Sequence, residues 1–146
     1  MVYATVADLL AAFGEQEVIA LTDREERIDS DNVGTVDAAV ALEALERASS
    51  EANTYLAARY QLPLSSTPKA LVAVVCDMAR YRLTGGETTE TTPIATRYRA
   101  AVAWLKDVAA GRAVLPDVAA TPAGGGVEFN TGRRDFARVY TETEEA

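Results

Sequence analysis

Histidine is absent from this chain of 146 residues, and cysteine occurs once, at Cys76. The lack of histidine removes the commonest general base and metal ligand, and every nucleophile activated by histidine. A lone cysteine forms no internal disulfide, which suits a reducing compartment, and Cys76 lies in an apolar stretch that favours a buried, unreactive thiol. We therefore expect a protein that is not an enzyme and that has no cofactor and no metal.

Long apolar runs are also absent. No run of about eighteen apolar residues occurs, so the sequence predicts no membrane span. The first ten residues, MVYATVADLL, lack a basic region followed by an apolar core, so we expect no signal peptide. A single domain with an ordinary apolar core is expected at this length.

Basic residues are scarce in the first part of the chain. Residues 1–60 contain twelve acids and four bases, whereas residues 61–146 contain ten of each. An acidic first part argues against broad contact with a nucleic-acid backbone. It fits either a solvated surface or the wall of a passage that should not bind DNA.

Apolar residues at helical spacing predict an all-α fold, a small bundle of two short helices followed by three long ones. We expect the short helices at 5–13 and 15–22, and the long ones at 37–60, at 67–84 and from Pro93 to the stop at Gly111. The helix at 67–84 is apolar on most of its surface, which predicts that it is the central one.

Helix caps support these boundaries. Thr5, followed three residues later by Asp8, is typical of a capping box, and Thr35 or Asp37 is expected to cap the first long helix. Thr67 and Thr92 each precede a proline, so both are predicted N-caps with proline at the first helical position.

Several polar or aromatic positions within the helices need an interpretation. Four poor helix formers of the first long helix are predicted to face solvent or a partner subunit: Ser49, Ser50, Asn53 and Thr54. Asp77 and Arg80, with Arg82 nearby, are interpreted as an ion pair within or between subunits rather than a catalytic set. Trp104 is expected to complete a core edge rather than bind a ligand.

The polar stretch 23–36 resembles the start of a calcium-binding loop. Asp29, Asp31 and Gly34 stand at the first, third and sixth positions. The fifth and twelfth positions are Val33 and Val40, which offer no carboxylate. A solvated turn is therefore the favoured interpretation.

The pattern changes after residue 111. We predict a helical domain at 1–111 and an extended C-terminal arm at 112–146, with a glycine hinge at 124–126. Alternation at Val127 and Phe129 allows one short strand. The arm contains arginines interleaved with aromatic residues, so it either packs back on its own bundle or becomes ordered on a partner.

Five segments, in this order, carry a family resemblance: 3–25, 51–64, 68–83, 97–115 and 129–138. Together they resemble the head–tail connector family of Mu-like phages and prophages. The resemblance implies a small helical adaptor of the phage neck, located in the virion between capsid and tail and made in the host cytoplasm. Such adaptors form a ring, expected to be a dodecamer, under the portal, and they extend the DNA channel and dock the next neck or tail protein.

The resemblance brings no catalytic residue, and it implies that the arm contacts the portal or a neighbouring subunit. The candidate contacts are Phe129, Arg133, Arg134, Phe136, Arg138 and Tyr140. DNA would pass through the ring without specific binding, and no membrane partner is expected. The alternatives are a tail-completion or stopper protein of the neck, and a small cytosolic binding module.

Overall fold

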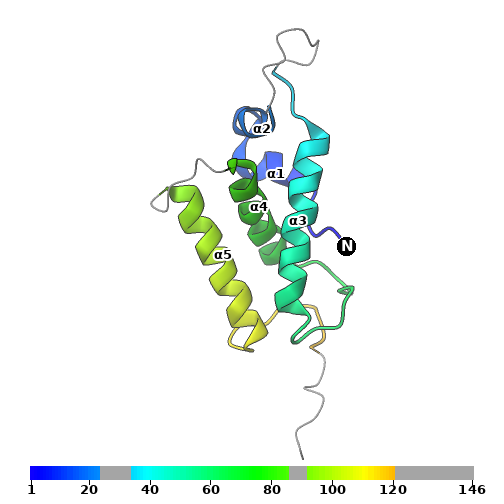
Figure 1. Ribbon diagram of the computed structural model, residues 1–146. Coiled ribbons are helices and arrows are strands. Elements are labelled where there is room, and N and C mark those ends of the chain that lie inside the picture. The colour runs from blue at the N-terminus through cyan, green and yellow to red at the C-terminus, as the bar shows by residue number, and fades with distance from the viewer. Residues whose placement is uncertain (24–33, 86–91, 121–146) are drawn as a thin grey trace, which may run out of the picture.

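The computed structural model describes residues 1–23, 34–85 and 92–120. The fold is an all-α bundle, as predicted (Figure 1). The described residues form the helices α1 (Val6–Phe13), α2 (Glu15–Thr22), α3 (Ala38–Leu56), α4 (Lys69–Leu83) and α5 (Pro93–Ala109). Their only β pairing is an isolated bridge between Tyr60 and Ala120. The strand considered at Val127 and Phe129 lies outside the described residues.

The central position predicted for α4 is confirmed. It packs against each of the other four helices. In Figure 1, α4 lies between α3 and α5, and α1 and α2 lie at its C-terminal end. Its side chains Leu71, Val75 and Met78 are fully buried and meet Leu45 of α3 and Leu105 of α5 in one hydrophobic core. Because burial of each such side chain contributes about 1.5–3 kcal/mol, this core is the main source of stability.

Side-chain caps define three helix starts. At α1, the Asp8 amide donates to the Thr5 hydroxyl over 3.2 Å and the Thr5 amide donates to the Asp8 carboxylate over 2.8 Å, which is the predicted capping box. The Thr5 hydroxyl also donates to the Asp8 carboxylate over 2.7 Å, and this bond, together with the one from the Thr5 amide, lowers the pKa of Asp8. Asp37 caps α3, and Thr92 caps α5 with Pro93 at its first position.

The cap predicted at Thr67 is wrong. Pro68 itself is the N-cap, with φ −63° and ψ 144°, and α4 begins at Lys69. The extended ψ keeps Pro68 outside the helix, so Thr67 lies one residue too early to reach the amides of the first turn. The Pro68 carbonyl accepts the first helical bonds, from Leu71 at 2.9 Å and Val72 at 3.2 Å.

The first long helix ends earlier than predicted, at Leu56 rather than Tyr60. Its last turn tightens, because the amides of Ala58 and Arg59 bond to carbonyls three residues earlier. Tyr60 then leaves the helix, and its buried hydroxyl accepts a hydrogen bond from the Leu115 amide at 2.9 Å. A contact distant in sequence therefore ends this helix.

The described part of the predicted arm, residues 112–120, lies along the bundle. Leu115 and Val118 are buried and belong to the hydrophobic core. The Ser66 hydroxyl donates to the Asp117 carbonyl over 3.1 Å. Gly111, which precedes this segment, has φ +75°, and a Cβ there would clash with the Arg59 guanidinium, so glycine suits both the turn and the close approach.

Two polar residues of α3 that were predicted to face solvent or a partner subunit bind the N-terminal segment instead. Ser49 is buried and accepts a hydrogen bond from the Tyr3 amide at 3.1 Å. Asn53 accepts one from the Tyr3 hydroxyl. Both side chains satisfy polar groups of the N-terminal segment, which would otherwise be buried without partners. Ser50 and Thr54 are exposed, as expected.

Candidate functional site

Three charged residues of α4, Asp77, Arg80 and Arg82, each pair with a residue of another helix. Arg80 donates to Glu17 of α2 over 2.6 Å, and its guanidinium lies 4.5 Å from the centre of the Phe13 ring. Asp77 lies 3.5 Å from Arg97 of α5. The pair predicted between Asp77 and Arg80 does not form, because these contacts take both residues to different sides of α4. The interpretation as ion pairs within the chain is confirmed.

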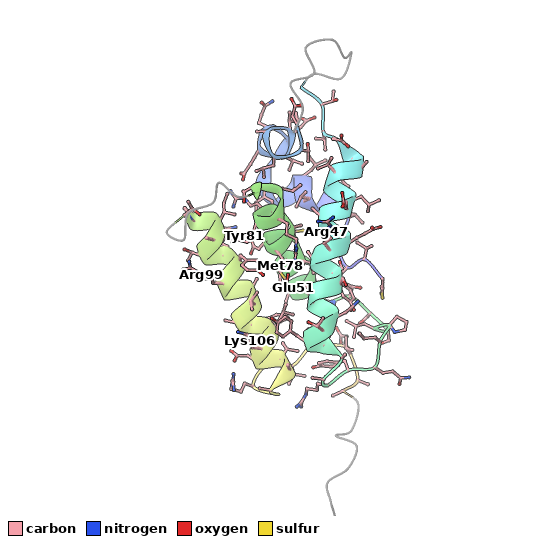
Figure 2. All side chains as sticks on the ribbon, in the orientation of Figure 1. Arg47, Glu51, Met78, Tyr81, Arg99 and Lys106 are labelled. Carbon is pink, nitrogen blue, oxygen red and sulfur yellow. The ribbon has the colours of Figure 1, made fainter. Side chains whose placement is uncertain are left out.

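A polar cluster joins the three long helices. One carboxylate oxygen of Glu51 accepts from Arg82 Nη2 at 2.5 Å, and the other accepts from the Tyr98 hydroxyl at 2.8 Å. The Tyr98 ring stacks on Tyr81, with 4.3 Å between ring centres and 15° between ring planes. Figure 2 labels Glu51 on α3 and Tyr81 on α4, which both face the space between α3 and α5. The cluster therefore ties α5 to the other two helices.

The Tyr98 hydroxyl of this cluster keeps its proton at neutral pH. Burial, together with the hydrogen bond to Glu51, raises the pKa of Tyr98 to about 12. A neutral phenol that donates to a carboxylate is a structural arrangement at neutral pH.

A shallow pocket lies beside the cluster, between α3 and α4. It is lined by Val40, Glu43, Ala44, Arg47 and Arg82. Both arginines of the lining already bind carboxylates, Arg47 that of Glu43 and Arg82 that of Glu51. Because these positive charges are compensated, the pocket has no strong attraction for an anion.

The remaining reactive groups are buried or dispersed. Burial raises the pKa of Cys76 to about 12, so it remains a thiol, and the prediction of a buried, unreactive cysteine is confirmed. Within residues 1–23, 34–85 and 92–120, no three Cys, Asp or Glu side chains gather as metal ligands would. Trp104 is partly buried and packs against the core edge, as predicted.

The two flanking long helices present exposed faces of different chemistry. The outer face of α5 consists of Thr96, Arg99, Ala100, Ala103 and Lys106, all exposed. The outer face of α3 consists of Ala39, Leu42, Glu43, Glu46, Arg47 and Ser50, also all exposed. The first face contains two cations and no acid, and the second contains two acids, one cation and the exposed apolar side chain of Leu42.

The arm residues predicted to bind a partner lie outside the described residues: Phe129, Arg133, Arg134, Phe136, Arg138 and Tyr140. The same holds for Asp29 and Asp31 of the calcium pattern, while Val40, at the twelfth position, lies in α3. None of the helices in the described ranges is long and apolar enough to cross a membrane.

Sequence reasoning missed the polar cluster. Glu51 is an unremarkable acid of the first long helix, and Tyr98 belongs to the apolar stripe of α5. Their partners lie 31 and 47 residues away along the chain. No local spacing predicts such contacts. The one feature of the sequence that pointed to this cluster was Arg82, a charged residue near the end of a mostly apolar helix.

Comparison with known proteins relates this chain to a family of phage proteins. The family model described as Bacteriophage Mu, Gp36 matches residues 3–130. Gene product J of Escherichia phage Mu is 39% identical over 127 residues, which cover 85% of this chain and 85% of that protein. The matched range contains all five helices and the segment that follows them. The chain therefore belongs to the Bacteriophage Mu Gp36 family.

Proposed function

We propose that this chain is a structural, non-enzymatic protein of the phage particle, a head–tail adaptor that forms a ring under the portal. In this position it extends the DNA channel and docks the next neck or tail protein. The observation that carries the proposal is a pair of unlike outer faces on α3 and α5 in a member of a phage Mu family. A ring of identical subunits needs two such different faces.

The interior of the bundle supports a structural role. Several of its polar side chains form ion pairs and hydrogen bonds between helices, as in the Glu51, Arg82 and Tyr98 cluster. Such contacts fix the positions of the helices relative to one another. A rigid subunit loses little conformational entropy on assembly, which favours a regular ring.

The charge of the chain suits a DNA passage. Residues 1–23 contain four acids and no base, and the whole chain has a formal charge of −8. A DNA phosphate backbone binds surfaces rich in lysine and arginine. A ring with this composition would let DNA pass without holding it.

The C-terminal arm is the proposed contact with the portal. The segment 112–120 is held to the bundle by Leu115 and Val118, so the chain that follows leaves from a fixed point near Tyr60. Arginine and aromatic side chains are the residue types that dominate binding energy at interfaces. We assign the portal contact to the six arm residues named above, and we propose twelve subunits in the ring.

The test is a cryo-EM map of phage particles focused on the portal vertex. A symmetric ring traced as this chain and seated on the portal is the expected result. A position further along the neck would instead indicate a tail-completion or stopper protein. A complete neck without this chain would contradict any virion role and favour a free binding module.

A truncation tests the arm separately. Removal of residues 124–146 keeps the segment 112–120, so we expect a folded bundle with an unchanged helical circular dichroism spectrum. We expect the truncated protein to be missing from particles. If it entered particles as the full chain does, the assignment of the portal contact to the arm would be wrong.

A further inference from the structure

We propose that an acidic segment at residues 141–146 binds the Arg59 guanidinium at one end of the bundle in the same copy of the chain. This segment, TETEEA, contains three glutamates and no basic residue. It follows Tyr140, the last residue assigned to the portal, and has no role in the proposed function. The inference therefore concerns the single chain and does not rest on the ring or on the portal contact.

Arg59 is a partly buried cation to which no described residue offers a carboxylate. Its buried Nε has no hydrogen-bond partner in the part of the chain that the structure describes. Five other arginines of these residues form ion pairs with acids: Arg47, Arg80, Arg82, Arg97 and Arg112. Because polar groups in protein interiors are nearly always paired, the Arg59 guanidinium is a place where an acceptor is expected.

The Arg59 guanidinium lies where two long helices end. The helix α3 ends at Leu56, and the guanidinium packs against Gly111, just after the end of α5. Figure 1 shows these two helix ends at the same end of the bundle. The carbonyl end of a helix carries partial negative charge, which favours a cation nearby. The two helix ends therefore stabilise a positive charge here without a carboxylate from the described residues.

The surface around Arg59 suits an approaching carboxylate. Residues 57–68, which link α3 to α4, contain this arginine and no acid. The nearby Arg112 is already neutralised by Asp107 at 2.6 Å, so Arg59 carries the uncompensated charge. Ala58 is exposed and small, so its side chain does not block access. The planar guanidinium presents paired N–H donors, which match the two oxygens of a carboxylate.

The course of the chain places the acidic segment within reach of this site. Ala120 forms a β-bridge with Tyr60, the residue that follows Arg59. Residues 121–140 start at that bridge and are long enough to turn back, since the cost of closing a loop grows slowly with its length. A group tethered in this way has an effective concentration on the order of millimolar, which exceeds that of acids on other copies in dilute solution. The tether therefore selects the segment of the same copy.

The test measures the effective concentration of two thiols in the full-length chain. Ala58→Cys lies beside Arg59, and Ala146→Cys lies in the acidic segment; their disulfide is equilibrated with glutathione. Cys76 is 2% exposed and serves as an unreactive background. Non-reducing gel electrophoresis separates looped monomers from covalent dimers, and we expect looped monomers.

Charge variants of this double-cysteine chain decide whether Arg59 holds the segment. Glu142→Gln, Glu144→Gln and Glu145→Gln together should lower the effective concentration about tenfold, because charge-assisted hydrogen bonds are lost. Arg59→Gln should give the same loss, and combining both sets should cause no further fall, because they remove one contact. Arg47→Gln changes an exposed arginine earlier on α3 and is the matched control, which should leave the value unchanged.

The outcomes give a clear decision. Circular dichroism checks the fold of Arg59→Gln, and the glutamate variant lies outside the described bundle, so it tests the proposal even if Arg59→Gln does not fold. An unchanged effective concentration in the glutamate variant would overturn the proposal. Covalent dimers in place of looped monomers would show that the segment reaches another copy, and would overturn its assignment to the same copy. The adaptor role is tested separately, by the map of the portal vertex.

Discussion

The helices α4 and α5 have similar lengths, 15 and 17 residues, but their charged side chains behave differently. On α4, Asp77, Arg80 and Arg82 each bind a residue of another helix. On α5, Arg99 and Lys106 are exposed on a face that no other described helix covers. Charges on the central helix therefore hold other helices in place, whereas Arg99 and Lys106 of the edge helix lie at the surface of the bundle.

The largest expected contrast concerns the core. Met78 of α4 is fully buried, so Met78→Ala should lower the free energy of unfolding by about 2–5 kcal/mol through lost contacts and a cavity. Lys106→Ala on α5 should change it by less than about 0.5 kcal/mol, because the side chain is exposed. Urea denaturation of both variants checks this. Equal losses would break the distinction between centre and edge.

A smaller contrast concerns arginines. The Arg80 side chain is 16% exposed and binds both Glu17 and the Phe13 ring, so Arg80→Ala should cost about 1–3 kcal/mol. Arg97 is 59% exposed and 3.5 Å from Asp77, so Arg97→Ala should cost about 0.2–1 kcal/mol. The same denaturation measurements decide the order, and a reversed order would contradict the role assigned to α4.

The subtlest effect concerns the inner face of α5. The pKa of Tyr98 is raised from its ordinary value of 10.0 to about 12, chiefly by burial. Between these two values the unfolded chain has lost the proton while the folded chain keeps it. The contribution of Tyr98 to the free energy of unfolding is therefore at its full value below pH 10. It decreases as the pH rises towards 12.

Ultraviolet absorbance of tyrosinate measures this titration, and Tyr98→Phe identifies the step that belongs to Tyr98. Glu51→Gln should lower the pKa, because it removes the carboxylate charge beside the phenol. An unchanged titration in Glu51→Gln would show that the negative charge of Glu51 does not act on Tyr98, and would contradict the contact between α5 and α3.

Local sequence patterns predicted the helices well, because caps and apolar spacing act within a few residues. The capping box at Thr5, the cap at Thr92 and the central place of α4 are all present. The cap predicted at Thr67 and the helix end at Tyr60 are wrong for a physical reason. At the start of α4 the extended backbone of Pro68 makes that residue the cap, and at the end of α3 the Tyr60 hydroxyl binds the distant Leu115 amide.

The predicted site residues of the arm remain predictions, and the surfaces proposed on α3 and α5 could be recognised only in part. The set of exposed residues on a helix follows from its apolar stripe, so the cations of α5 are visible in the sequence. Which of those exposed residues another helix covers is not visible there. Ser49 and Asn53 were expected on the surface, yet Tyr3 binds both.

By itself, the sequence determined the helical class, most helix starts, the central helix and the acidic character of the first part of the chain. These properties depend on periodicity, capping and charge counts, which neighbouring residues establish together. Only the tertiary structure decided the partners of Asp77, Arg80 and Glu51, the burial of Leu115, and which face of α5 stays open. Those outcomes depend on contacts between residues tens of positions apart, and such distances in sequence carry no local signal of proximity in space.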